Sequence, residues 1–200
     1  MKSGWTQKYP GYANEIQEVI ISEEDIQEKV QDLGRLISQD YMGRNLLLVG
    51  VLKGVLFFLA DLLRNISIPV EMDFIAVSSY SSESRDQGYV RLVKDLDIPI
   101  HQRHVLFVED VIDTGLTLNY ILQNLRARQP ASLEVCALFN KPDHRLIDIP
   151  MRYKGFDLPD KFVVGYGLDF KEKYRNLPFV GLLKASSIQN QVQNKGKRVF

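Results

Sequence analysis

Residues 105–118 read Val-Leu-Phe-Val-Glu-Asp-Val-Ile-Asp-Thr-Gly-Leu-Thr-Leu, and this stretch decides the fold. Its first four residues are apolar, as is typical of a strand buried on both faces of a parallel sheet. Three carboxylates then follow within five residues, and a helix is predicted over residues 116–128. A strand, an acidic loop and a helix in direct succession predict an α/β unit whose ligand lies at the carboxyl end of the strand.

The same alternation of strand and helix continues on both sides of this stretch. A capping box at Ser22 and Asp25 begins an amphipathic helix of about 20 residues that ends at Gly43. A second helix is expected over residues 55–64. Strands are expected at residues 15–21, 46–51, 69–77, 89–94, 104–108, 133–139, 162–164 and 179–183. The fold class is therefore α/β, and the segments after Val51, Val77, Val108 and Phe139 are expected to hold the site.

Length and charge narrow the class of protein. Two hundred residues predict a single domain over residues 1–200, with an N-terminal arm or irregular lead-in at 1–14 and a disordered tail at 190–200. Twenty-five basic and twenty-five acidic residues give zero net charge, so no nucleic-acid partner and no membrane surface is expected. The single cysteine, Cys136, is expected to be an inert core thiol in a cytoplasmic protein.

Residues 109–117 combine two kinds of chemistry. Thr114, Gly115 and Thr117 offer hydroxyls and backbone N–H groups at a helix start, which is a cradle for a phosphate. Glu109 and Asp110 would repel that phosphate, but they suit sugar hydroxyls and Mg²⁺. The ligand that matches both is a phosphorylated sugar. The residues alone leave open a structural interpretation, in which Asp113 or Thr114 caps the helix and the acid pair is a solvated part of a loop.

Residues 108–118 resemble the phosphoribosyl pyrophosphate signature of the type I phosphoribosyltransferases, through the arrangement acid-acid-x-x-Asp-Thr-Gly-x-Thr. Four further segments resemble the hypoxanthine-guanine branch of that family and occur in the same order. They are Leu52-Lys53-Gly54, Ser79-Tyr80, Lys141-Pro142, and Phe162-Val163-Val164-Gly165-Tyr166-Gly167-Leu168-Asp169 with Arg175 beyond. The resemblance implies the family's fold: a mostly parallel central sheet flanked by helices, a small hood and a flexible lid loop.

The resemblance also implies a reaction, the Mg²⁺-dependent transfer of phosphoribosyl from phosphoribosyl pyrophosphate to hypoxanthine or guanine in purine salvage. Asp113 would be the general base at purine N7. The phosphoribose would be held by Glu109, Asp110, Thr114, Gly115, Leu116 and Thr117. Mg²⁺ would lie beside Glu109 and Asp110, and a second Mg²⁺ would lie beside Asp169.

The remaining roles are likewise implied by the resemblance. Pyrophosphate would meet Lys53, Gly54 and Arg175, with a cis peptide bond before Lys53. The purine would meet Lys141, Phe162, Val163 and Asp169, and the Lys141 ammonium favours a 6-oxo over a 6-amino group because it only donates hydrogen bonds. Ser79 and Tyr80 would begin the lid.

Three alternatives or open points remain at the level of sequence. A transferase that prefers guanine or xanthine has the same motifs. A non-catalytic nucleotide-sensing regulator would share the fold, but only about 20 residues precede the family-like region, which is too short for a helix-turn-helix domain. The resemblance implies a homo-oligomer, a dimer or a tetramer.

Overall fold

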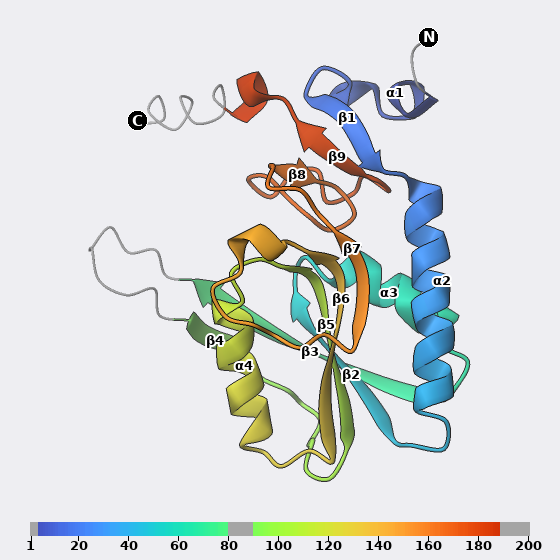
Figure 1. Cartoon of the computed structure of the whole chain (residues 1–200), viewed down its shortest axis with the longest axis vertical. Helices are drawn as coiled ribbons and strands as arrows, with labels where there is room; N and C mark the ends of the chain where they lie inside the picture. The colour runs from blue at the N-terminus through green and yellow to red at the C-terminus, as the bar shows by residue number, and fades with distance from the viewer. Residues whose placement is uncertain (1–3, 80–89, 189–200) are drawn as a thin grey trace, which may run out of the picture. The chain divides into compact units, whose positions relative to one another are not determined.

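The computed structural model describes residues 4–79 and 90–188 (Figure 1). The chain divides into two compact units. One consists of residues 27–160, and the other combines the two ends of the chain, residues 1–26 and 161–200. The predicted tail at 190–200 lies outside the described residues.

The unit of residues 27–160 is built on a six-stranded sheet in the order β4-β3-β2-β5-β6-β7. Its members are β2 (Leu46–Leu52), β3 (Val70–Ser79), β4 (Val90–Lys94), β5 (His104–Ile112), β6 (Ser132–Asn140) and β7 (Tyr153–Asp157). All neighbours pair in parallel except β4, which runs antiparallel to β3. The α/β class with a mostly parallel sheet is confirmed, and β7 is a strand that the sequence did not indicate.

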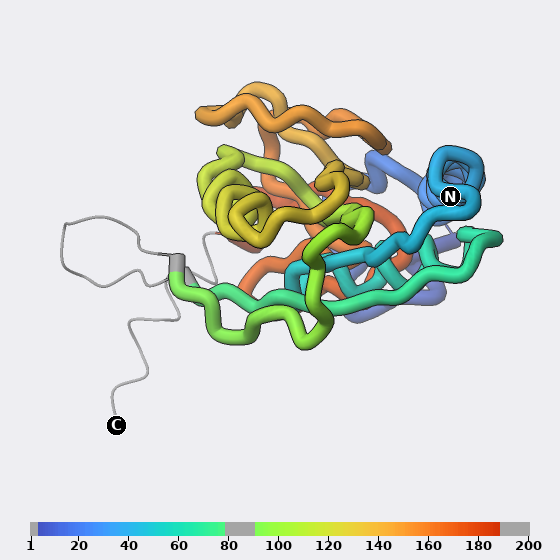
Figure 2. The backbone as a smooth tube through the Cα atoms, turned by 90° about the horizontal axis from the view of Figure 1, so that it is seen from below, coloured from blue at the N-terminus to red at the C-terminus, as the bar shows by residue number. Residues whose placement is uncertain are grey.

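Helices cover both faces of this sheet (Figures 1 and 2). The apolar side of α4 (Leu116–Arg126) packs on Leu47 and Val49 of β2 and on the same face of β5. On the opposite face, a Cβ placed on Gly50 would touch Val55 and Leu59, so α3 (Leu56–Asn65) covers that side. Gly34 of α2 (Glu23–Asp40) approaches Asn65, so α2 packs on α3. The sheet core is therefore closed on both faces, as the unbroken apolar run of β2 requires.

The predicted capping box at the start of α2 is confirmed. The hydroxyl of Ser22 accepts a hydrogen bond from the backbone N–H of Asp25 at 3.0 Å, and it donates to the Asp25 carboxylate at 2.7 Å. Two polar groups at the helix start thus satisfy each other.

The antiparallel hairpin of β3 and β4 is tied to the rest of this unit at its base. The buried carboxylate of Asp73 accepts hydrogen bonds from the N–H groups of Phe74, Asp97 and Ile98 at 2.7, 2.7 and 2.9 Å. It also accepts a bond from Lys94 Nζ at 3.3 Å. Burial by itself raises the pKa of Asp73, but these hydrogen bonds outweigh burial and hold the pKa below its usual value.

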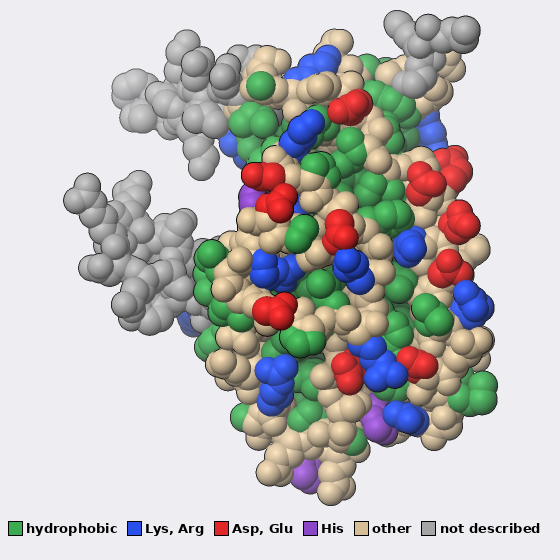
Figure 3. Space-filling model, in the orientation of Figure 1, with side chains coloured by type: hydrophobic (Ala, Val, Ile, Leu, Met, Phe, Trp, Pro, Cys, Tyr) green, Lys and Arg blue, Asp and Glu red, His purple; other side chains and the backbone are tan. Residues whose placement is uncertain are grey.

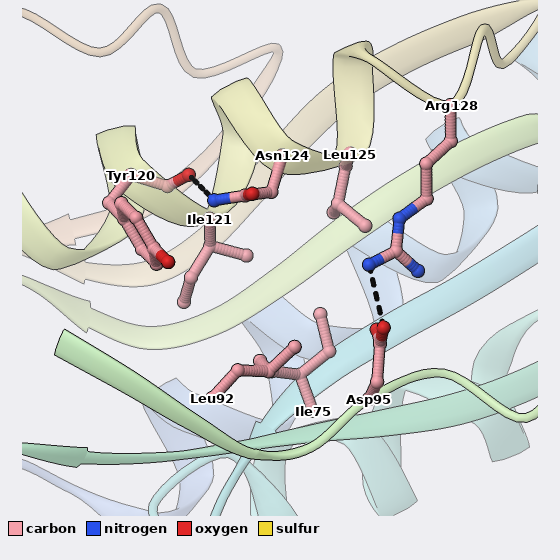
Figure 4. Close-up of a pocket in the computed structure, with 8 residues that line it drawn as sticks. All are labelled: Ile75, Leu92, Asp95, Tyr120, Ile121, Asn124, Leu125 and Arg128. Carbon is pink, nitrogen blue, oxygen red and sulfur yellow. Dashed lines mark hydrogen bonds and ion pairs between the residues drawn. The ribbon is translucent and has the colours of Figure 1, made fainter.

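Helix α4 is joined to the same hairpin by an apolar contact and an ion pair (Figure 4). Ile121 and Leu125 point toward Ile75 of β3, and Arg128 reaches the carboxylate of Asp95 at 2.8 Å. The hollow between them has a volume of about 30 Å³, which is the space of a water molecule and not of a substrate.

The second unit contains an antiparallel sheet in the order β1 (Ile16–Ile21), β9 (Val180–Leu183) and β8 (Val163–Val164). The segment predicted as an irregular arm forms two short helical elements, α1 (Gly4–Lys8) and η1 (Pro10–Tyr12). The sequence did not indicate these two helical elements. Trp5 and Tyr9 pack on the ring of Phe179, with centroids 5.4 and 6.2 Å apart. Aromatic contacts thus hold this segment on the unit's core.

The surface is mixed in charge. Figure 3 shows acidic and basic side chains interspersed on the face that it draws, as expected for a chain of zero net charge. Within residues 4–79 and 90–188, no helix has the length and apolar character needed to cross a membrane. Cys136 is buried in β6, and burial raises the pKa of its thiol, as expected for an inert core cysteine.

Candidate active site at the carboxyl edge of the sheet

A pocket of about 280 Å³ opens where the parallel strands β2, β3 and β5 end. Val51 and Val77 close one side of it. Residues 109–115, Thr117 and Leu118 line the rest. The acidic segment and the helix start that the sequence singled out therefore face one cavity, at the edge of the sheet where ligands of such folds bind.

The acid pair lies in the strand and not in a loop. The sequence predicted that β5 ends at Val108, but Glu109 pairs with Ala137 and Val111 with Phe139 of β6, so β5 runs to Ile112. That boundary was wrong because apolar residues at 111 and 112 continue the strand beyond the two charges. The interpretation of Glu109 and Asp110 as solvated loop acids is excluded.

The carboxylate of Glu109 is unusual in the surroundings of its Oε2 atom and in its pKa. Its Oε2 is buried and has no hydrogen-bond partner in the described part of the chain. Burial raises the pKa of Glu109 well above its usual value, and the negative charge of Asp110 raises it further. A buried carboxylate oxygen without a partner is costly, so this oxygen indicates a group that completes the site.

The predicted pyrophosphate loop lies beside the acid pair. The peptide bond between Leu52 and Lys53 is cis, as the resemblance implied. A Cβ on Gly54 would overlap the carboxylate of Asp110, at 2.7 Å from its Cγ. The turn after β2 thus approaches the end of β5 closely, and a glycine is needed at that contact.

The predicted phosphate cradle forms the first turn of α4. Gly115 has a φ of +83°, in the left-handed region that favours glycine. A Cβ at Gly115 would lie 2.8 Å from the carbonyl oxygen of Ile147. The hydroxyl of Thr114 accepts a long hydrogen bond of 3.4 Å from the N–H of Leu116, while Asp113 is turned to another partner. The N-cap residue of α4 is Gly115, so neither Asp113 nor Thr114 caps the helix in the way that the structural interpretation required.

Asp113 has a partner that the sequence did not reveal. Its Oδ1 lies 2.9 Å from Nδ1 of His144, whose Nε2 lies 2.5 Å from Oδ1 of Asp160. The hydrogen bond to Asp160 is the largest cause that raises the pKa of His144 above its usual value, and the hydrogen bond to Asp113 is the second. In the sequence, the only signal for His144 is its place three residues after Lys141.

Lys141 directly follows β6 and begins the turn that carries this histidine. The N–H of Lys141 donates to the carbonyl of Ile112 at 3.0 Å, so the predicted purine-reading lysine and the end of β5 are joined through the backbone. Ser79 ends β3, and Tyr80 lies outside the described residues.

The other predicted residues lie in the second unit. Phe162 is exposed over 43% of its surface and packs edge-on against Phe170, whereas Val163 is buried in β8. Asp169 and Arg175 form an ion pair of 2.8 Å. Arg175 also donates to the carbonyl of Gly167, and its Nε is buried without a described partner.

The chemistry of the site follows from these placements. A helix N-terminus with a close-approach glycine binds an anion. Two adjacent carboxylates, one of them with a buried oxygen, bind hydroxyls or a hard cation. A half-exposed carboxylate beside them, Asp113, is placed to accept a proton from a ligand. Phosphate, sugar and proton-bearing base are the three parts that this order of groups would receive.

Comparison with known proteins identifies the family of the chain. The family model "Phosphoribosyl transferase domain" matches residues 22–171. A hypoxanthine-guanine phosphoribosyltransferase of Streptococcus agalactiae is 50% identical over 171 residues, covering 86% of this chain and 95% of that protein. The enzyme of the same name from Mycobacterium tuberculosis is 48% identical over 181 residues, covering 88% of each.

Solved structures resemble this chain over similar lengths. The crystal structure of a hypoxanthine phosphoribosyltransferase from Staphylococcus aureus has a TM-score of 0.82 and 44% identity, and covers 86% of this chain and 94% of that one. A hypoxanthine phosphoribosyltransferase from Trypanosoma cruzi has a TM-score of 0.84 and 34% identity, and covers 90% and 97%.

Proposed function

The chain belongs to the phosphoribosyl transferase domain family, and on that premise we propose that it makes purine nucleotides. The reaction transfers phosphoribosyl from phosphoribosyl pyrophosphate to hypoxanthine or guanine. The bond between C1′ and the pyrophosphate oxygen breaks, a bond between C1′ and purine N9 forms, and the N7 proton leaves. The proposal is supported by the pocket that residues 109–115, Thr117 and Leu118 line, where the acid pair, Asp113 and the start of α4 follow one another.

We assign the sugar phosphate to the first turn of α4. Backbone N–H groups at residues 115–117 and the hydroxyls of Thr114 and Thr117 supply the donors. Leu116 adds no charge, because it contributes only its backbone. The ribose hydroxyls fall to Glu109 and Asp110, whose carboxylates accept hydrogen bonds from them.

The acid pair also fits Mg²⁺. Mg²⁺ is usually held by one or two carboxylates, with waters and substrate oxygens as the other ligands. Glu109 offers a buried oxygen without a described partner, and Asp110 stands next to it at the pocket. We assign Asp169, in the second unit, to a second Mg²⁺. When bound, Mg²⁺ would screen the charge of the leaving pyrophosphate.

The purine and pyrophosphate roles rest on the motifs and on local geometry. Asp113 takes the N7 proton, which prevents a positive ring from forming as N9 bonds to C1′. We assign Lys141 to the 6-oxo group, Phe162 to the purine face and Val163 to the ring edge, together with Asp169. Lys53, Gly54 and Arg175 would hold pyrophosphate, and Ser79 and Tyr80 would begin a segment that closes over the reacting atoms.

Two further properties belong to the proposal. A cytoplasmic location is supported by the single buried thiol, Cys136, which forms no disulfide within the chain. We also propose a homo-oligomer, and sedimentation equilibrium at micromolar concentration distinguishes a dimer or tetramer from a monomer.

Product analysis tests the reaction itself. With Mg²⁺, phosphoribosyl pyrophosphate and hypoxanthine or guanine, the protein should release one pyrophosphate for each nucleoside monophosphate formed. Release of pyrophosphate without nucleotide would identify a hydrolase. Binding of phosphoribosyl pyrophosphate without release of either product would identify a regulator. Both results contradict the proposal.

A further inference from the structure

His144 stands between two carboxylates on a turn that is fastened around Asp113. The short helix η2 (Pro142–His144) begins directly after Lys141, whose N–H donates to the carbonyl of Ile112, the residue before Asp113. The N–H groups of Leu146 and Ile147 donate to the carbonyl of Thr114, the residue after Asp113, at 3.0 and 3.1 Å. The backbone on either side of Asp113 is therefore bonded to the backbone on either side of His144.

A side-chain brace strengthens the same turn. Nη2 of Arg145 donates to the carbonyl of Ile112 at 3.3 Å and to the Oδ1 of Asn140, the last residue of β6. Asn140 is buried and donates to the carboxylate of Asp157 at 2.6 Å. The position of the His144 ring relative to Asp113 is thus set by the rigid ends of β5 and β6.

The two contacts of His144 define its protonation state. Carboxylates at neutral pH only accept hydrogen bonds, so each contact requires an N–H on the imidazole ring. Since Nδ1 lies beside Asp113 and Nε2 beside Asp160, we assign a proton to each ring nitrogen, which makes the ring positively charged. The raised pKa of His144 agrees with that state. The turn also contains the charged side chains of Lys141, Asp143 and Arg145.

We propose that His144 is a positioning residue for the general base, holding Asp113 by Oδ1 so that Oδ2 takes the purine N7 proton. Asp160 anchors the far side of the ring and fixes its orientation. The inference rests on the role of Asp113 in the proposed function. A carboxylate free to rotate would spend only part of its time in the productive orientation, and misplacement of a catalytic group by about 1 Å can cost roughly a hundredfold in rate.

The ion pairs of His144 with Asp113 and Asp160 contribute little to folding. The side chains of His144, Asp113 and Asp160 are 38, 52 and 63% exposed, and ion pairs in such solvated positions add little stability. Variants at His144 are therefore expected to fold, and their effect should fall on the rate of transfer.

Two conservative variants separate positioning from general structure. The amide nitrogen of Asn in His144→Asn takes approximately the place of Nδ1 and keeps the bond to Asp113. The amide nitrogen of Gln in His144→Gln takes that of Nε2 and reaches Asp160 instead. We expect kcat to stay within about threefold of the wild type for Asn, and to fall about tenfold for Gln and for His144→Ala. The KM for phosphoribosyl pyrophosphate should not change. His101→Ala, which removes an exposed histidine elsewhere, is the matched control.

Equal kcat values for the Asn and Gln variants, whether high or low, would overturn the proposal, because the bond to Asp113 that the proposal requires is kept in the Asn variant and lost in the Gln variant. NMR titration of the His144 ring tests the contact without reference to activity. Asp160→Asn and Asp113→Asn should each lower its pKa, with Asp160→Asn having the larger effect. An unchanged pKa in Asp113→Asn would show that the contact is absent in solution and would also overturn the proposal. A failure of the proposed function would instead appear as absence of transfer by the wild-type protein while this titration behaves as expected.

Discussion

Gly54, in the turn after β2, faces the carboxylate of Asp110 in β5 so closely that any side chain at position 54 would occupy the place of that carboxylate. The relationship joins the turn assigned to pyrophosphate with the acid pair assigned to the ribose. Under these two assignments, the absence of a Cβ at position 54 serves the binding of substrate as well as the turn.

Gly54→Ala tests that relationship. The carboxylate of Asp110 can rotate away from the new methyl group, so the protein should still fold, but the ribose would lose a correctly placed acceptor. We expect the KM for phosphoribosyl pyrophosphate to rise about tenfold or more. Gly11→Ala is the control, because a Cβ there meets nothing within 4 Å. Equal KM values in the two variants would contradict the assigned role of Gly54.

Gly115→Ala should destabilise the fold as well as the site. The residue would keep a φ near +83° and place its methyl group against the carbonyl of Ile147. Backbone strain of this kind costs about 1–3 kcal/mol, measurable as a lower free energy of unfolding in urea. Leu116→Ala, a change in an exposed neighbour, should stay within about 0.5 kcal/mol. A Gly115→Ala variant as stable as the wild type would show that the turn can take another conformation.

Asp113→Asn removes the proposed proton acceptor while keeping the size of the side chain. We expect kcat to fall about 10²–10⁴-fold, because an amide cannot take the N7 proton, with little change in the Kd for phosphoribosyl pyrophosphate. Asp143→Asn, an exposed carboxylate of the neighbouring turn, is the matched control and should keep its turnover. Near-normal turnover of Asp113→Asn would assign the proton to another group.

Lys141→Ala should act on the purine alone. Loss of a charged donor to the 6-oxo group should raise the purine KM about tenfold to a hundredfold. The KM for phosphoribosyl pyrophosphate should stay constant, since we assign that substrate to other residues. Lys8→Ala, which removes an exposed lysine of α1, should change neither constant. An unchanged purine KM in Lys141→Ala would remove Lys141 from the base site.

Asp73→Asn should weaken the base of the β3–β4 hairpin. The neutral amide cannot replace a carboxylate that accepts three backbone N–H bonds and one bond from Lys94, and we expect a loss of about 2–3 kcal/mol in the free energy of unfolding. Asp97→Asn, with a side chain 80% exposed, should cost less than about 0.5 kcal/mol.

The same carboxylate predicts a dependence on pH. The pKa of Asp73 is lowered in the folded state, so its stabilising effect is complete above the unfolded value of about 3.9 and is lost as the pH falls through the folded-state pKa. Urea unfolding below pH 5 should therefore show a shallower acid loss in Asp73→Asn than in the wild type. If the free energy of unfolding fell equally steeply below pH 5 in the two proteins, this account of Asp73 would be contradicted.

The central strands of the sheet could be predicted from the local sequence pattern because they are buried on both faces. The apolar run at residues 46–51 and the four apolar residues before Glu109 predicted central parallel strands, and both pair in parallel. β7 was not readable. Its sequence, Tyr-Lys-Gly-Phe-Asp, contains a glycine, which strand patterns disfavour, and Gly155 is required there because a Cβ would meet the backbone of Leu138.

The residue types of the candidate site could be predicted from the sequence, but the contacts between them could not. Residues 109–117 carry their chemistry in one continuous segment, so their pattern predicts a phosphate, a sugar and a cation without knowledge of the fold. The contact of His144 with Asp113 spans 31 positions and depends on where β6 ends. Nothing in either local sequence indicates that contact, and only the folded backbone brings the two side chains together.

A spectrophotometric assay with Mg²⁺ and phosphoribosyl pyrophosphate, run separately with hypoxanthine, guanine, xanthine and adenine, is the most direct test of whether the protein transfers phosphoribosyl to 6-oxopurines. We expect kcat/KM for hypoxanthine or guanine to exceed that for adenine by at least about a hundredfold, because a site that hydrogen-bonds a 6-oxo group rejects a base that cannot complete those hydrogen bonds. Equal use of adenine, or no turnover of any of the four bases, would contradict it.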